Sequence, residues 1–185
     1  NGKKVTAVVE LLARFDEESN IKWSKRMQEE GINVIFGVEG LKIHSKLLYI
    51  ESKQGNIACI GTGNFHEGNA KTYTDYLMMT ARKNIVQEVG KVFDFIDRPF
   101  SQVRFKELMV SPNSMKNRIL SLINNEIKNA KAGREAWVKM KINHITEMDV
   151  VNKLYAASAA GVKIGIVLRG NSSLVTGVPG VSDNI

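Results

Sequence analysis

The sequence is poor in cysteine and in aromatic residues, and it has no long apolar run. Its single cysteine excludes an internal disulfide framework and is typical of a reducing cytoplasm. No stretch of about 18 apolar residues occurs, so no membrane-spanning helix is predicted. Aromatic residues make up only 7% and do not alternate with basic ones, which argues against a stacking platform for single-stranded nucleic acid. The opening segment NGKKVTAVVELL lacks a small-residue cleavage site, and we interpret it as a core strand rather than a signal peptide.

What the chain does have is a globular composition and an excess of positive charge. Hydrophobic residues make up 43% and charged residues 24% of the sequence, which excludes a disordered chain. The net charge of +7 and the pI near 9.5 favour polyanionic ligands: nucleic acid, anionic lipid, nucleotide phosphates or inorganic polyphosphate. The basic residues are scattered along the chain, so charge alone leaves the kind of polyanion open.

Hydrophobic periodicity predicts an α/β fold in the first part of the chain. A strand, a helix ended by Gly31 and a second strand predict a parallel pair with a right-handed crossover. Two strands joined by a turn, a further strand, and a helix ended by Arg98 and Pro99 follow. The predicted strands are residues 5–12, 32–37, 46–52, 56–63 and 73–80, and the predicted helices are 15–30 and 84–97.

A second part follows residues 98–114, which contain two prolines and little periodicity. It is predicted to hold helices at 114–131 and 147–160 and strands at 136–142 and 162–170. Aligning Gly31 with Gly161, an offset of 130 (161 minus 31), superposes two strand–helix–strand units and indicates an internal repeat. We therefore expect two similar domains. The first, 1–107, lacks its N-terminal part, and the second, 108–185, is truncated at its C-terminus.

The main chemical signal is LKIHSKLLYI, in which His44 and Lys46 lie two residues apart at the entry to a predicted strand. Period two places both side chains on one face of the strand. A histidine there can attack phosphorus as a nucleophile, and a lysine beside it can neutralise phosphate oxygens. By itself this pair is a weak signal, since a basic chain offers such pairs by chance.

A second motif, GTGNF, ends the next predicted strand. Gly61 and Gly63 flank Thr62, allow tight turns and let backbone N–H groups face an anion. Asn64 can hydrogen-bond a phosphoryl oxygen or fix an imidazole nitrogen. The two motifs on successive strands form a specific combination.

Together, H-x-K and G-[ST]-G-N resemble the half-site of the phospholipase D superfamily. The strings ELLARFDEESNIKW, GLKIHSKL, IGTGNFHEGNAKTYTDY, LMVSPNS, LYAASAAGV, VLRGNSSL and GVSDNI resemble the C-terminal half of polyphosphate kinases. The resemblance covers nearly the whole chain. It implies a phospholipase D-like mixed sheet flanked by helices, in one nearly complete domain and the start of a second. It also implies reversible transfer of the ATP γ-phosphate to inorganic polyphosphate through a phosphohistidine.

The same resemblance implies roles for individual residues. His44 matches the phosphohistidine, Tyr73 a tyrosine at the nucleotide, and Arg169 an arginine on the nucleotide phosphates. Arg14 matches an arginine of the magnesium–phosphate region, where a guanidinium can hold phosphate oxygens but cannot ligate the metal. The second essential histidine of the family has no counterpart in the sequence.

Two positions depart from the family patterns. Glu51 stands where a phospholipase D half-site normally has an aspartate, and Cys59 stands where some kinases of the family have a histidine. We interpret Cys59 as a small buried residue.

Three further residues remain open candidates. His66 is interpreted as a solvated loop histidine near the site. His144 aligns with Arg14 in the repeat (144 minus 130), which makes it a candidate phosphate neighbour. Asp75 is predicted to share a strand face with Tyr73, and it either orients His44 or a metal-bound water, or caps the strand.

The resemblance thus implies a polyphosphate kinase that uses Mg²⁺ and has ATP, ADP and inorganic polyphosphate as partners, with no specific nucleic acid. One alternative is a phospholipase D-like phosphodiesterase or nuclease, and another is a non-catalytic fragment that binds polyanions. We expect the isolated fragment to be inactive and the full-length protein to be a homo-oligomer. The expected location is the cytoplasm, with peripheral membrane association left open.

Overall fold

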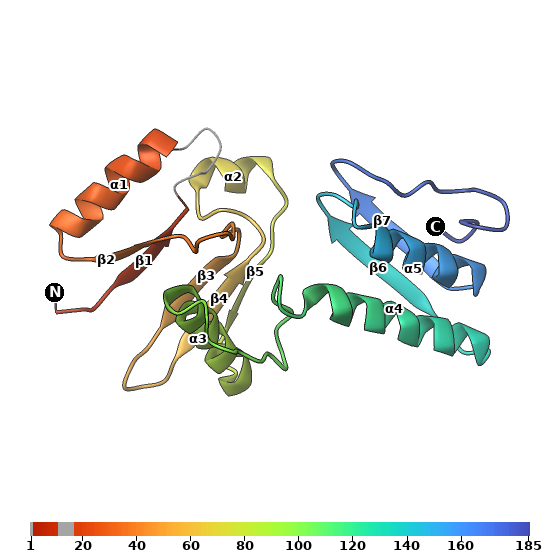
Figure 1. Ribbon diagram of the computed structural model, residues 1–185, viewed down its shortest axis with the longest axis horizontal. Helices are drawn as coiled ribbons and strands as arrows, with labels where there is room; N and C mark the ends of the chain where they lie inside the picture. Colours follow the sequence, from red (N-terminus) through yellow and green to blue (C-terminus); the bar gives the residue numbers. More distant parts are fainter. Residues whose placement is uncertain (1, 11–16) are drawn as a thin grey trace. The chain divides into compact units, whose positions relative to one another are not determined.

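A computed structural model describes residues 2–10 and 17–185 of the chain (Figure 1). The chain divides into two units, Asn1–Leu108 and Met109–Ile185, which are described separately. Both contain strands and helices, and the expected α/β class is confirmed, with parallel and antiparallel strand pairs both present. Within the described residues, no helix is long and apolar enough to cross a membrane.

The first unit begins with the expected strand–helix–strand. Strands β1 (Thr6–Val9) and β2 (Asn33–Phe36) pair in parallel, and helix α1 (Glu17–Glu29) lies between them in the chain. Acidic residues in the first turn of α1 and Arg26 in its last turn complement the helix dipole. Gly31, at φ +78°, ends the helix in a conformation that favours glycine. The strand expected at 5–12 is described only as far as β1, because residues 11–16, with the predicted site residue Arg14, lie outside the described part.

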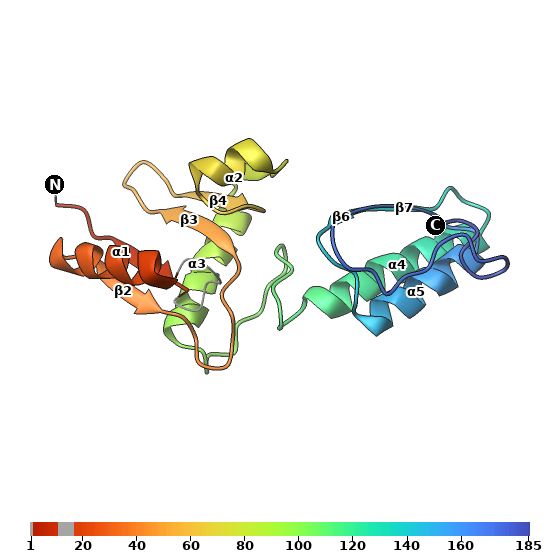
Figure 2. The same ribbon diagram turned by 90° about the horizontal axis from the view of Figure 1, so that it is seen from above.

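The rest of the first unit is an antiparallel sheet covered on one face by a helix. Strands β3 (Lys46–Ile50), β4 (Ile57–Gly61) and β5 (Leu77–Thr80) lie in that order, and α3 (Lys83–Asp97) packs on β3 and β4 (Figures 1 and 2). Val86 and Val89 of α3 are buried against Ala58, with Leu47 and Tyr49 of β3 packed beside them. Since side chains alternate along a strand, Lys46 lies on the face away from α3.

One predicted element is wrong in its extent. A strand was expected at 73–80, but β5 begins at Leu77 and a short helix, α2 (Glu67–Thr72), precedes it. The ring Nδ1 of His66 accepts a hydrogen bond from the Gly68 backbone N–H at 3.1 Å and caps this helix. Tyr73 is the residue that ends α2. Tyr73 and Asp75 therefore precede β5 and do not share a strand face.

The second unit is a parallel strand pair with two helices on one face. Strands β6 (Trp137–Ile142) and β7 (Lys163–Leu168) pair in parallel, and α4 (Met115–Lys131) and α5 (Met148–Ala159) lie together on the same side (Figure 2). The core contains Ile123 of α4, Val151 and Leu154 of α5, and Ile164 of β7.

The internal repeat is real at the level of elements, but its register is off by one residue. β2 and β7 align at the expected offset of 130, since Lys163 corresponds to Asn33 (163 minus 33). Their partners Trp137 and Thr6 are 131 residues apart (137 minus 6). A slip of one residue turns every side chain of a strand to the other face. Arg14 lies outside the described residues, so its alignment with His144 stays a prediction.

A buried carboxylate fixes the segment that leads out of the first unit. Glu88 of α3 is 5% exposed, and its two oxygens accept hydrogen bonds from three backbone N–H groups. Lys106 donates at 2.6 Å, Glu107 at 3.0 Å and Leu108 at 2.8 Å. Because these donors belong to a loop without regular structure, Glu88 supplies the partners that a helix or sheet would otherwise provide.

Candidate active site

Two hydrogen bonds hold the His44 segment, one within the segment and one to the residue after β1. The ammonium Nζ of Lys46 donates to the backbone oxygen of His44 at 2.6 Å, so the lysine folds back along the strand toward the histidine. The backbone N–H of Ile43 donates to Oε2 of Glu10 at 3.0 Å, which ties the segment to the end of β1. The sequence analysis did not single out Glu10, because its partner Ile43 lies 33 residues away.

The electrostatics of this segment favour a neutral imidazole. His44 is an exposed residue, but partial burial of its ring lowers its pKa from the ordinary value of 6.5, and the nearby charges of Lys46 and Lys42 lower it further. Burial also lowers the pKa of Lys46, Lys42 acts in the same direction, and Asp75 opposes them. A neutral imidazole has the lone pair that a nucleophile needs, so the lowered pKa of His44 agrees with the role predicted for this residue.

The glycine-rich loop is fixed to a second segment by Thr62. Its hydroxyl donates to Oδ1 of Asp75 at 2.9 Å and accepts from the Tyr76 backbone N–H at 2.9 Å. The Thr62 backbone N–H donates to the Tyr76 carbonyl at 3.0 Å. In the sheet, Gly61 lies opposite Lys46. The structure therefore brings the H-x-K and GTGN motifs together, with Asp75 beside them.

Gly63 lies very close to the Asp75 carboxylate. A Cβ atom at this position would lie 2.0 Å from Oδ2 of Asp75 and 2.4 Å from its Cγ. At Gly61 the nearest atom to an added Cβ is Cδ1 of Leu77, at 3.4 Å. The two glycines of the motif therefore differ: only Gly63 makes room for a carboxylate.

The other candidates of the first unit have different surroundings. Cys59 is 3% exposed, which confirms it as a small buried residue. Asn64 and Tyr73 are exposed near the loop, and the Asn64 carbonyl accepts from the His66 backbone N–H at 2.8 Å. Glu51 accepts a hydrogen bond from the Tyr49 hydroxyl at 2.9 Å.

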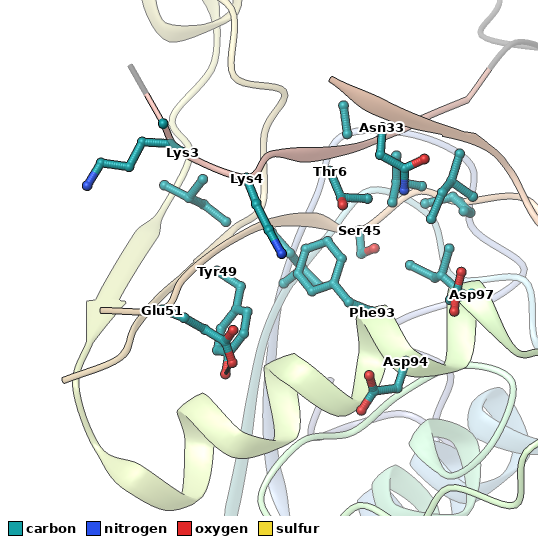
Figure 3. A pocket seen from close by; sticks show the side chains of 18 residues that line it. Lys3, Lys4, Thr6, Asn33, Ser45, Tyr49, Glu51, Phe93, Asp94 and Asp97 are labelled. Carbon is teal, nitrogen blue, oxygen red and sulfur yellow. Dashed lines mark hydrogen bonds between the residues drawn. The ribbon is translucent and has the colours of Figure 1, made fainter. Parts of the chain in front are cut away.

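A cavity of about 840 Å³ lies beside β3. Of the His44 segment, Ile43, Ser45, Leu47, Leu48 and Tyr49 line this cavity, whereas His44 and Lys46 do not. Figure 3 shows Lys3 and Lys4 with three carboxylates at its wall, from Glu51, Asp94 and Asp97. Because its acids outnumber its lysines, this cavity is unsuited to a polyanion, and we place the candidate site at His44 and Lys46 instead.

The candidate site offers cations and amides rather than a set of metal ligands. Across residues 2–10 and 17–185, no group of three or more His, Cys, Asp or Glu side chains is placed to hold a metal ion. Asp75 is the carboxylate next to Lys46, and Thr62 already donates to it. The described residues therefore hold no set of three or more such metal ligands, and Asp75 is the carboxylate beside the site.

Arg169 lies in the second unit, at the end of β7. Its Nε donates to Oδ1 of Asn143 at 2.7 Å. Asn143 was not predicted from the sequence, and no local pattern connects two residues that are 26 positions apart.

Comparisons with known proteins agree along the whole chain. A family model described as "Polyphosphate kinase C-terminal domain 1" matches residues 1–102, and one described as "Polyphosphate kinase C-terminal domain 2" matches residues 108–185. The chain is 53% identical to a polyphosphate kinase of Vibrio parahaemolyticus and 47% identical to one of Escherichia coli. All of this chain aligns in both comparisons, and it spans 27% and 28% of the length of those relatives.

A solved structure gives the same result for the fold. The crystal structure of a polyphosphate kinase from Porphyromonas gingivalis matches with a TM-score of 0.84 and 39% sequence identity. The match covers 100% of this chain and 31% of that one.

Proposed function

The chain belongs to the polyphosphate kinase family, and from that premise we propose that His44 accepts the γ-phosphoryl group of ATP and passes it to inorganic polyphosphate. The observation that supports the proposal is the His44–Lys46 contact, together with the pairing of Lys46 with Gly61, the first residue of the GTGN motif. The lowered pKa of His44 supports it, because the imidazole is neutral where ATP is fully charged.

In the proposed reaction, a ring nitrogen of His44 forms a bond to the γ-phosphorus while the bond between that phosphorus and the β–γ bridging oxygen breaks. ADP leaves with the electron pair of the broken bond. A terminal phosphate oxygen of polyphosphate then attacks the phosphohistidine, the N–P bond breaks, and the chain is one phosphate longer. Each step is reversible, since a phosphoramidate is readily cleaved again.

The residues around His44 contribute by positioning and by charge. Phosphoryl transfer requires little covalent chemistry from the protein beyond the nucleophile, so cations and N–H donors near the phosphoryl oxygens have the largest effect. Lys46 supplies a positive charge beside His44. The backbone N–H groups of Gly63 and Asn64 are the proposed donors of the loop, since that of Thr62 donates to the Tyr76 carbonyl. Asp75 acts through Thr62 as a positioning residue for that loop.

The other predicted attributes remain proposals. Mg²⁺ would supply charge neutralisation, and such ions are usually bound through one or two carboxylates together with substrate phosphates. Tyr73 and Arg14 are proposed to act at the nucleotide and its phosphates. A homo-oligomeric state and a cytoplasmic location are also kept as predictions.

The test is to locate the phosphoryl group on the complete gene product. After brief incubation with γ-labelled ATP, we expect acid-labile, base-stable label in the tryptic peptide 43–46, which contains His44 as its only histidine. His66 and His144 fall in other tryptic peptides and are internal controls. Label in either of those peptides would assign the nucleophile to His66 or His144 instead of His44. Acid-stable label on 43–46 would point to Ser45. No label, together with cleavage of a phosphodiester, would favour a phospholipase D-like phosphodiesterase.

The charges that lower the pKa of His44 predict how phosphoenzyme formation depends on pH. Lys42 lowers the pKa of His44, so Lys42→Gln is expected to raise that pKa toward 6.5. As the pH falls, the imidazole of the variant then becomes protonated at a higher pH than in the parent. The acid limb of the pH–rate profile for phosphoenzyme formation should therefore move upward by about a few tenths of a pH unit, the size expected from removing one solvent-screened charge. Single-turnover rates across pH measure this shift. Lys53→Gln, a charge change in the β3–β4 turn, is the control, and an equal shift in both variants would contradict the assignment.

A further inference from the structure

The C-terminal ends of β6 and β7 form a bulge that exposes several polar side chains. The ladder pairs Ile142 with Leu168 and resumes where Ile145 pairs with Ser172. Between these two points, two residues of one strand lie opposite three of the other. Bulges of this kind redirect side chains and are frequent next to active sites.

Two hydrogen bonds cross this bulge. Asn143 accepts at Oδ1 from Nε of Arg169 at 2.7 Å, and His144 accepts at Nδ1 from the Asn171 backbone N–H at 2.9 Å. Beyond them, Ile145 and Asn171 are joined by a backbone hydrogen bond of 3.0 Å. The bulge is therefore fixed at its middle as well as at its ends.

The bond to Asn171 decides which tautomer His144 adopts. A nitrogen that accepts a hydrogen bond carries no proton, so the proton of the neutral ring lies on Nε2, which is then a donor. Asn143 accepts a hydrogen bond from Nε of Arg169, and the guanidinium is a permanent cation with several N–H donors. The two side chains thus present donors of the kind that bind phosphate oxygens.

Gly170 is what allows the ring to lie so close to the backbone. A Cβ atom there would be 2.4 Å from Cε1 and 2.5 Å from Nδ1 of His144, and 2.6 Å from the backbone oxygen of Asn143. A side chain at this position would displace the ring or the strand. The arrangement therefore depends on Arg169, Gly170 and Asn171 together.

We propose that His144 is a phosphate-binding residue that acts beside Arg169, and that Asn143 is the residue that positions the Arg169 guanidinium. The ligand is a phosphate group of inorganic polyphosphate or of a nucleotide, so the inference rests on the proposed function and names a further contact for its substrates. Lys139 and Lys141, exposed along β6, add positive charge along the strand that leads to this bulge.

The same unit offers a matched control at the opposite end of the strand pair. Arg134, just before β6, donates from Nε at 3.1 Å and from Nη2 at 2.8 Å to Oδ1 of Asn129. This is the same arginine–asparagine chemistry, but it precedes the strand instead of following it and has no histidine partner in the two bonds. Arg134→Ala removes as much charge as a change at Arg169 would, at a place where no phosphate site is proposed.

The test is an NMR titration of the 185-residue chain with tripolyphosphate at constant ionic strength, with a parallel titration using ADP. The backbone amides of Gly170 and Asn171 are the local reporters, and the His144 ring nitrogens report the tautomer. His144→Asn keeps an acceptor near the Nδ1 position and removes the Nε2 donor. Asn143→Asp keeps the acceptor but adds a negative charge that competes with phosphate.

We expect saturable shifts at both amides and a dissociation constant raised about tenfold in each of these two variants, the size expected for one charge-assisted hydrogen bond. Arg134→Ala should leave the constant unchanged. Tighter binding of tripolyphosphate than of ADP would assign the site to the polyphosphate chain, and the reverse to the nucleotide. Unchanged affinity in His144→Asn would show that the ring only caps the backbone and would overturn the proposal. The titration requires no turnover, so its result is independent of whether His44 becomes phosphorylated.

Discussion

Adding one methyl group at Gly63 is expected to lower kcat/KM for phosphoryl transfer about 100-fold, whereas the same change at Gly61 should leave most of the activity. In Gly63→Ala the new Cβ would lie 2.0 Å from the Asp75 carboxylate oxygen, and that carboxylate is held by the Thr62 hydroxyl. The clash must move either the carboxylate or the loop, and misplacement of catalytic groups by about 1 Å costs on the order of 10² in rate. At Gly61 the nearest contact, 3.4 Å, is tolerable.

Steady-state kinetics of Gly63→Ala, Asp75→Ala and the double variant identify the cause. If the methyl group acts by displacing Asp75, the double variant should be no slower than Asp75→Ala alone, because the clash disappears with the carboxylate. Additive losses would show that Gly63 matters for another reason, such as the use of its own N–H group. Equal activity of Gly61→Ala and Gly63→Ala would contradict the steric argument altogether.

The order of helices and strands was predictable because it depends on local periodicity. The first helix, its end at Gly31 and the two parallel pairs are all as expected, and each follows from apolar spacing and glycine position. Helix α2 was missed for a physical reason. The segment FHEGNAKT has no apolar stripe, contains a glycine in the first turn, and is capped by His66, a residue that is uncommon in this role.

The motif pair at the site was also predictable, but the contacts that hold it were not. His44, Lys46 and the GTGN loop were identified from residue types that suit phosphate chemistry, and the register of β3 with β4 brings them together. The Glu10–Ile43 bond joins residues 33 apart, and the Thr62–Asp75 bond joins residues 13 apart. Neither contact could be predicted from helix or strand periodicity, because each depends on the tertiary arrangement of strands and loops.

Replacing Glu88 by alanine is expected to lower the free energy of unfolding of the first unit by about 2–4 kcal/mol at pH 7. The substitution leaves the three N–H donors of residues 106–108 without the carboxylate that accepts from them. Urea unfolding followed by Trp23 fluorescence measures the loss. Trp137→Phe as background removes the tryptophan of the second unit, the only other one in the sequence. Glu107→Gln is the matched control, because it removes the same charge from an exposed neighbour and should change stability by less than about 0.5 kcal/mol.

The pH dependence separates this hydrogen-bonding role from simple packing. Burial alone would raise the pKa of Glu88, but the bonds from Leu108, Lys106 and Glu107 and the charge of Lys91 lower it overall. A carboxyl whose folded pKa is lowered stabilises the folded state above its unfolded pKa, and this contribution is lost as the pH falls through the folded value. The stability difference between the parent and Glu88→Gln should therefore be full at pH 7 and shrink below about pH 4. A difference that stays constant down to about pH 3 would mean that Glu88 contributes through its packing, and that its ionised carboxylate does not hold the loop.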